Sequence, residues 1–282
     1  MEPAEYWSVE EDNTPEKSAK HRARERAFNS GNLKKAIYTE FGGEQTSKSQ
    51  KQFVNDLLEQ HRGEPLSMDD ILLDSSEYRI VFRNITNSTN ERTMIASVIP
   101  KDVICHDKLI TVRPYEIAPT EEDLEEFPLH GAYDRAFTDQ ELFVAIGLLN
   151  SIPFDFIMRT KIDTTVVTYK FNESQMPRLT EGDDWFEYIS VRAARLNCYG
   201  DRFEEMRERL GGLEPITGKE ARKRARVELN AAAFHAYDLE HDDMEFILND
   251  FYRVSNPQLM TEEYFDQVKK KYEKLAEKGP LP

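Results

Sequence analysis

Cysteine is scarce in this chain, which has only two cysteines among 282 residues. Cys105 and Cys198 lie far apart in the sequence and neither belongs to a Cys-x-x-Cys pair, so we expect neither a zinc site nor a disulfide framework. The amino-terminal residues are acidic and include no apolar core, so we expect no signal peptide. The longest apolar run, 142–158, is interrupted by polar residues and a proline, and is not expected to span a membrane. A cytoplasmic location is the default expectation.

Positive charge is also in short supply, since 37 Lys and Arg residues face 53 Asp and Glu residues and the formal net charge is -16. Taken as an average, this charge argues against nucleic-acid binding, because affinity for DNA depends on cations that displace counterions. The charges are segregated, however: the stretch 79–113 has six basic and three acidic residues, and basic islands recur at 17–35 and 219–226. Such segregation is typical of a DNA-facing surface on an acidic protein. A general acidic bias caused by high internal salt explains the same total.

A polar loop lies between two strand-like runs near the middle of the chain. The run 78–82 is β-branched and aromatic, and the run 93–100 alternates apolar with small or polar residues until a proline ends it. The Asn-Ser-Thr-Asn sequence at 87–90 favours a turn, which predicts a hairpin tip. Arg83 and Arg92 flank this tip, and their planar guanidinium groups suit a phosphate or the acceptor edge of guanine. The same arginines are equally suited to tying loop to loop, or to pairing with Glu91.

Four segments resemble a known family. The first is the order Arg83, Ile85, Thr86, Thr89, Asn90, Arg92, Thr93, Ala96, Ile99 and Pro100, which resembles the C-terminal, TaqI-like specificity domain of adenine-type restriction-modification DNA methyltransferases. LLNSIPFDFIMRTK (148–161) resembles the second signature of that family, and FNESQMP (171–177) lies where the family closes the domain. ELNAAAFHAYDLEHDDMEFIL (228–248) is similar to the helical tail of large members from restriction and phage-defence systems. The resemblance covers roughly 77–180 and 220–275, and the first 76 residues match only loosely, through Tyr6 and Trp7.

The catalytic motifs that such a methyltransferase needs are missing. The chain has no Gly-x-Gly for an S-adenosylmethionine loop, no Pro-Pro of an Asn-Pro-Pro-aromatic motif, and no Pro-Asp that would begin a nuclease signature; Asn256-Pro257 is the nearest fragment. The resemblance therefore implies the target-recognition half of a related enzyme, with no catalytic, cofactor or metal residues of its own. Its partners would be double-stranded DNA and a methyltransferase catalytic domain or subunit that carries S-adenosylmethionine. Two other interpretations stay open: a module that clamps a methyltransferase or nuclease, and an acidic DNA mimic.

The candidate DNA-binding residues come from the loop and from a second basic cluster. They are Arg83, Asn87, Thr89, Asn90, Arg92, Thr93, Lys101, Arg159 and Lys161. Asn87, Thr89 and Asn90 are explained more simply as turn formers than as base readers, and the phenylalanines that precede Arg159 are explained most simply as core. The histidines and aspartates at 235–243 superficially resemble metal ligands, but helix capping and solvation explain them better.

The fold class that the sequence predicts is α+β. A polar, partly helical extension is expected over 1–76, a recognition core of strands and helices over 77–180, and a helical region over 181–282. Helices are expected at 48–60, 138–149 and 261–276 and around 244–251, and Thr138 with Glu141 predicts a capping box for the second of these. We also expect the two runs that flank the polar loop to share one sheet, with the 138–149 helix packed on it.

Overall fold

A computed structural model describes residues 18–251, 254 and 257–280 of the chain. Three residues singled out in the sequence lie outside this range: Tyr6, Trp7 and Asn256. The chain divides into two compact units, each assembled from separate segments. Unit 1 consists of 1–79, 101–104 and 113–136, and unit 2 consists of 80–100, 105–112 and 137–282. These units do not coincide with the three regions expected along the sequence, because 101–104 and 113–136 fold with the amino-terminal helices.

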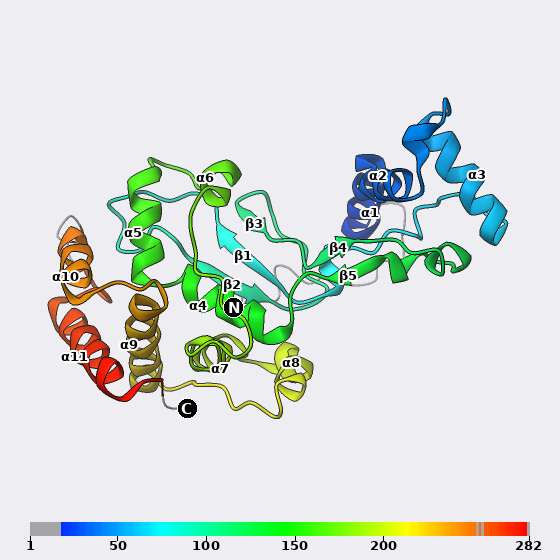
Figure 1. The fold of residues 1–282 in the computed structure, drawn as a ribbon. Coiled ribbons are helices and arrows are strands. Elements are labelled where there is room, and N and C mark those ends of the chain that lie inside the picture. The colour runs from blue at the N-terminus through cyan, green and yellow to red at the C-terminus, as the bar shows by residue number, and fades with distance from the viewer. Residues whose placement is uncertain (1–17, 252–253, 255–256, 281–282) are drawn as a thin grey trace. The chain divides into compact units, whose positions relative to one another are not determined.

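The described part of unit 1 combines helices with a small hairpin (Figure 1). Its elements are α1 (Ala19–Ser30), α2 (Asn32–Glu40), α3 (Gln50–Arg62), β4 (Tyr115–Ile117), β5 (Tyr133–Arg135) and the 3-10 turns Gly43–Gln45, Asp74–Ser76, Asp123–Glu125 and His130–Ala132. The hydroxyls of Ser18 and Ser49 cap α1 and α3 by accepting hydrogen bonds from backbone N–H groups. Gly31 ends α1 at a φ of 72°, a left-handed conformation that favours glycine. The strands β4 and β5 pair antiparallel.

The apolar core of unit 1 joins its helices to the hairpin segment. It consists of Leu33, Ile37, Val54, Leu58, Ile71, Leu73, Leu124, Leu129 and Ala132, all buried. Leu33 and Ile37 are one turn apart on α2, and Val54 and Leu58 are one turn apart on α3, so each helix turns one apolar stripe inward. The segment 113–136 thereby supplies part of the core of helices that precede it by more than fifty residues.

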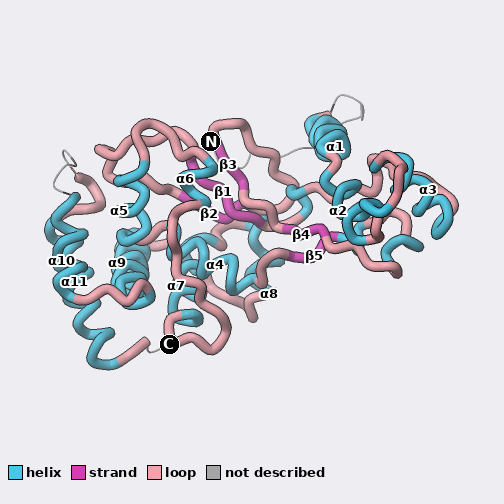
Figure 2. The backbone as a smooth tube through the Cα atoms, turned by 45° about the horizontal axis from the view of Figure 1, so that its top comes forward, coloured by secondary structure: helices cyan, strands magenta, loops and turns pink. Residues whose placement is uncertain are grey.

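Unit 2 consists of a three-stranded sheet with helices packed around it. Its elements are β1 (Arg79–Arg83, whose first residue belongs to unit 1), β2 (Ala96–Ile99), β3 (Leu109–Thr111), α4 (Asp139–Leu149), α5 (Ile152–Lys161), α6 (Thr168–Asn172), α7 (Phe186–Asn197), the 3-10 turn Asp201–Phe203, α8 (Glu204–Arg209), α9 (Lys219–Ala236), α10 (His241–Asp250) and α11 (Glu262–Lys278). The strand order is β2-β1-β3, and β1 pairs antiparallel with β3. Figure 2 shows the three strands running together beside α4.

Several expectations from the sequence are confirmed. The fold is α+β, with 54% helix and 8% strand. The strands on either side of the polar loop are neighbours in one sheet, and α4 packs on β2. The capping box of α4 is present, since the Thr138 hydroxyl accepts from the N–H of Glu141 and the Glu141 carboxylate accepts from the N–H of Thr138. The carboxyl-terminal helix runs slightly longer than expected, to Lys278.

The two cysteines occupy different environments, which leads to a first prediction. Cys198, at the end of α7, is fully buried, and its burial raises the pKa of its thiol to about 12. Cys105 is half-buried. Because the thiolate is the reactive form, we expect a native chain to react with a disulfide reagent such as DTNB at Cys105 and to protect Cys198, whereas the denatured chain should release two equivalents. The variant Cys105→Ser provides the control: rapid native labelling of that variant would contradict the buried state of Cys198.

Candidate nucleic-acid interface

The polar loop of unit 2 spans 84–95, between the end of β1 and the start of β2, and is called the 84–95 loop below. Its base extends the sheet by pairing with the segment that follows α5. The N–H of Thr86 donates to the carbonyl of Thr164 at 3.1 Å, and the carbonyl of Asn84 accepts from the N–H of Val166 at 2.8 Å. A β-bridge between Ile85 and Thr165 lies between these two bonds. The loop therefore leaves the sheet in a fixed direction.

The tip of the loop is a turn that Asn87 organises. The side-chain oxygen of Asn87 accepts from the N–H of Thr89 at 2.9 Å and from its hydroxyl at 3.0 Å, and the Asn87 carbonyl accepts from the N–H of Asn90. Asn87 and Thr89 are exposed, whereas Asn90 is half-buried and Thr93 is fully buried. The turn predicted from the sequence is present, and its exposed side chains are the asparagine and the threonine at its tip.

A buried carboxylate on α5 holds the loop in place. Asp155 has no exposed surface, and its Oδ1 accepts from the N–H of Met94 at 2.8 Å and from Nε of Arg92 at 3.2 Å. Its Oδ2 accepts from Nε of Arg159, one turn further along α5, at 2.8 Å. One carboxylate thus pairs with two arginines and one backbone donor, as a buried charge requires. We call Asp155, Arg92 and Arg159 the Asp155 cluster.

Arg159 extends the cluster along the turn, because its guanidinium donates to three loop carbonyls. Nη1 donates to Ser88 at 2.7 Å, and Nη2 donates to Asn90 at 2.7 Å and to Glu91 at 2.8 Å. The face of the guanidinium lies 4.3 Å from the ring centroid of Phe251. The planar fork of Arg159 is therefore engaged within the protein, where it gathers carbonyl groups that would otherwise repel one another.

The two loop arginines are also engaged within unit 2. Arg92 donates from Nη2 to the carbonyl of Asn150 at 2.6 Å, and the amide of Asn150 in turn bonds the backbone N–H and C=O of Ala96 at 3.0 and 2.9 Å. Arg83 donates from Nη2 to the hydroxyl of Thr86 and to the carbonyl of Arg92, both at 2.9 Å. Of the interpretations that the sequence left open, tying loop to loop describes the positions of these arginines.

Glu91 links the loop to the carboxyl-terminal helix instead of pairing with an arginine. Its Oε1 accepts from the N–H of Met260 at 2.6 Å and from the N–H of Leu259. Both donors immediately precede α11. The 84–95 loop is thus attached to α5, to the sheet and to the start of α11.

Neither of the lysines proposed from the sequence belongs to the Asp155 cluster. Lys161, at the end of α5, donates to the carbonyl of Glu173 at 2.9 Å and to the hydroxyl of Ser174 at 3.2 Å. Lys101 belongs to unit 1, where its ammonium lies 5.4 Å from the ring centroid of Tyr78. The structure brings together the seven other candidates, which lie at the end of β1, in the loop or on α5.

Three residues of this network received no role from the sequence: Asp155, Asn150 and Asn230. Asn230 of α9 is buried, and its side-chain oxygen accepts from the N–H of Ile152 at 2.7 Å, at the start of α5. Its amide donates to the hydroxyl of Tyr264 at 2.8 Å, and burial of that tyrosine raises the pKa of its phenol. A sequence signal existed for Asp155, since a carboxylate inside an apolar run with an arginine four residues later is typical of a buried ion pair.

Comparisons with protein-family models, with curated proteins and with solved structures find no match to the chain. Within 18–251 and 257–280, no group of three or more His, Cys, Asp or Glu side chains is arranged to hold a metal ion. His235 stacks between Trp185 and Tyr272, with ring centroids 4.9 and 4.1 Å away, and its burial lowers its pKa. No single described helix is long and apolar enough to cross a membrane; α4 and α5 meet the length and composition only as a pair bent by 60°.

Proposed function

We propose that this chain is the DNA target-recognition part of a restriction-modification or phage-defence adenine methyltransferase. In this proposal the 84–95 loop contacts the bases or backbone that flank the target, and a catalytic domain carried elsewhere binds S-adenosylmethionine and methylates the adenine. The related enzymes flip their target base out of the duplex, so the recognition part has to hold the flanking sequence in register.

The observation that carries the proposal is that the segments which resemble the family are one another's partners. The loop segment bonds Asp155 and Asn150 of the second segment, and the N–H of Ile152 in the second segment donates to the side chain of Asn230 in the fourth. These hydrogen bonds join residues up to 78 positions apart in the sequence. Residues that resemble a family motif and also meet in space support a common domain more strongly than a similarity in sequence order does.

The geometry assigns different roles to the candidates within this proposal. Arg83 and Arg159 donate to a hydroxyl and carbonyls of the loop, and Arg92 donates from the loop to Asp155 and to the carbonyl of Asn150, so all three position it. Asn87 and Thr89 are exposed at its tip, where an amide and a hydroxyl are able to bond base edges in a groove. A loop that is already rigid loses less conformational entropy when it binds, which favours a defined contact.

The test is a selection of bound sequences from a randomised duplex library, followed by fluorescence anisotropy over a salt series. We expect the wild-type chain to select a sequence preference and Thr89→Ala or Asn87→Ala to relax it by about 1 to 3 kcal/mol at one position, because a lost base contact removes discrimination. Each measurement is repeated with a methyltransferase subunit if a neighbouring gene encodes one, because recognition can depend on the catalytic part.

The matched control is Thr180→Ala, another exposed threonine of unit 2, which lies in a turn with Asp183. It should leave the selected sequence unchanged. Identical selections by Thr89→Ala, Asn87→Ala and wild type would contradict a role for the tip in recognition. Association with the methyltransferase without any binding to DNA would replace this proposal by the interaction module.

A further inference from the structure

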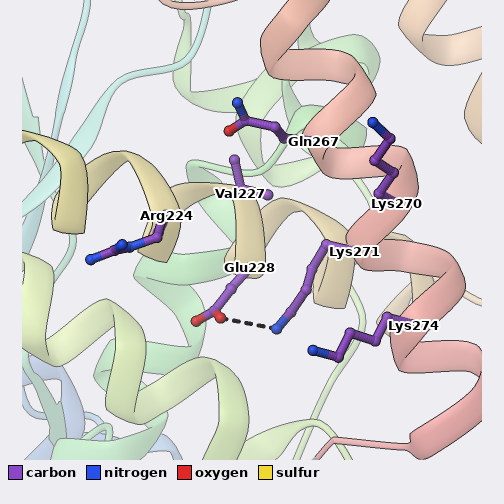
Figure 3. A pocket seen from close by; sticks show the side chains of 7 residues that line it. All are labelled: Arg224, Val227, Glu228, Gln267, Lys270, Lys271 and Lys274. Atoms are coloured by element: carbon purple, nitrogen blue, oxygen red, sulfur yellow. Dashed lines mark hydrogen bonds and ion pairs between the residues drawn. The ribbon is translucent and has the colours of Figure 1, made fainter.

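A shallow groove of about 310 Å³ lies between α9 and α11 of unit 2. Figure 3 shows the side chains that line it, which come from two helices packed side by side. Its lining residues are Arg224, Val227, Glu228, Gln267, Lys270, Lys271 and Lys274. Four of these seven carry a positive charge and one carries a negative charge, in a chain whose net charge is -16. Such a local reversal of sign requires an explanation.

The single acidic residue of the groove, Glu228, is already paired with two cations of the same unit. Glu228 accepts from Nζ of Lys271 at 2.9 Å and from Nε of Arg192 at 2.8 Å. Burial favours its neutral form, but the hydrogen bonds from Lys271 and Arg192 prevail and lower its pKa. Figure 3 shows the side chains of Glu228 and Lys271 reaching toward each other from the two helices. Arg224, Lys270 and Lys274 therefore remain as charges that Glu228 does not offset.

These three cations are placed to meet a row of anions. All three are exposed, with Arg224 on α9 and the two lysines one turn apart on α11, about 6 Å along the helix axis. Near the start of α9, burial and repulsion from Arg226 lower the pKa of Arg222. An open groove with cations on both of its helices suits an extended polyanion. One small anion would need an enclosed site with converging donors.

We propose that the α9–α11 groove binds the phosphate backbone of DNA outside the target sequence, through Arg224, Lys270 and Lys274. The choice of DNA as the polyanion rests on the proposed function, but the groove contact itself needs no sequence recognition. Phosphate contacts fix the register and orientation of a duplex without reading its sequence. The groove would thus add affinity to the discrimination that the 84–95 loop supplies.

The experiment measures binding of the full chain to a short, fluorescently labelled duplex of random sequence over a salt series. The triple variant Arg224→Ala/Lys270→Ala/Lys274→Ala should bind about tenfold more weakly at low salt. The slope of log K against log salt should become shallower by about 2 to 3, because each neutralised phosphate contributes about 0.9. The loss should be the same for unrelated sequences, and Arg224→Lys, which keeps the charge, should retain wild-type binding within about twofold.

The matched control is Lys48→Ala/Lys51→Ala/Arg178→Ala, which removes the same charge from exposed positions outside the groove and outside the basic islands. Wild-type binding in this control supports the groove, whereas an equal loss in both triples overturns it, because net charge alone would then be responsible. The proposal is also overturned if the groove triple binds the duplex as tightly as wild type. It is likewise overturned if, in a parallel measurement, the triple loses binding only to phosphatidylserine vesicles and not to the duplex. If the groove is overturned but Thr89→Ala still changes the selected sequence, the proposed function stands without the groove. If the groove triple lowers the salt slope but the wild-type chain selects no sequence, the groove contact stands and the proposed function fails.

Discussion

Replacing Asp155 with alanine is expected to lower the free energy of unfolding of unit 2 by about 3 to 5 kcal/mol. The side chains of Arg159 and Arg92 are only 4% and 15% exposed, so removal of their shared carboxylate leaves two cations with little access to water. The N–H of Met94 loses its acceptor in the same step. Denaturation in urea measures the change, followed by the fluorescence of Trp185, which stacks on His235 in unit 2.

Two further variants separate the charge of Asp155 from its shape. Asp155→Asn keeps an acceptor for Met94 but removes the charge, so it should fall between wild type and Asp155→Ala. Asp163→Ala, just beyond the end of α5 and exposed, should change stability by no more than about 0.5 kcal/mol. If Asp155→Ala stays within about 1 kcal/mol of wild type, the two arginines must reach water in solution, and the Asp155 cluster would not be what holds the loop.

The sequence predicted the elements around this cluster because their signals are local. The capping box of α4 involves residues three apart, and the turn of the 84–95 loop depends on Asn87 and the residues that immediately follow it. The β-branched and aromatic residues of 78–82 predicted β1, and the alternation of 93–100 predicted β2, although β2 begins only at Ala96. Local signals of this kind decide which elements form, and the α+β class follows from them.

The pairing of Asp155 with the 84–95 loop could not be predicted in the same way. Arg92 and Asp155 are 63 residues apart, so nothing in either neighbourhood indicates the other. An arginine beside a polar turn has the same local sequence whether its guanidinium contacts a phosphate or a backbone carbonyl. Burial decides between these uses, and burial depends on how α5 packs against the loop, which is a property of the whole unit.

The division into units escaped the sequence analysis for a related reason. The segment 113–136 falls within the recognition core expected over 77–180, yet it packs against α2 and α3. The contact that fixes this segment joins the N–H of Leu129 to the carboxylate of Asp70, 59 residues earlier. The many acidic residues of that segment suggest a solvent-exposed stretch. A few apolar residues, such as Leu124 and Leu129, are buried in the core of unit 1 and determine where the segment packs.

The pair of Asp70 and Arg62 gives the second large expected effect, in unit 1. The Asp70 side chain has no exposed surface and that of Arg62 is 2% exposed. Arg62 donates from Nη1 and Nη2 to the two carboxylate oxygens at 2.7 and 2.8 Å, and the N–H groups of Ser67 and Leu129 donate at 2.8 and 3.0 Å. Asp70→Ala should therefore destabilise unit 1 by about 3 to 5 kcal/mol, since Arg62 would be left charged in the interior.

This effect should also depend on pH, in a direction that the contacts determine. Burial raises the pKa of Asp70, but the hydrogen bonds from Arg62, Ser67 and Leu129 outweigh burial and leave the pKa below its ordinary value of 3.8. A carboxyl group with a lower pKa in the folded state stabilises fully above the unfolded pKa, and this stabilisation is lost as the pH falls through the folded value. The stability difference between wild type and Asp70→Asn should accordingly be constant near neutral pH and shrink below about pH 4.

Hydrogen exchange of the peptides that cover α3 and the β4–β5 hairpin measures this difference within unit 1 alone. Asp69→Asn is the matched control. Asp69 is the adjacent carboxylate, its side chain is 69% exposed, and its ion pair with Arg24 is long, at 3.4 Å. An exposed pair of this kind contributes little, so exchange in the control should follow wild type at every pH. Equal protection in Asp70→Asn and Asp69→Asn at neutral pH would mean that Leu129 and α3 are joined by their apolar contacts alone. Faster exchange confined to Asp70→Asn would identify the carboxylate as the link between α3 and the hairpin segment.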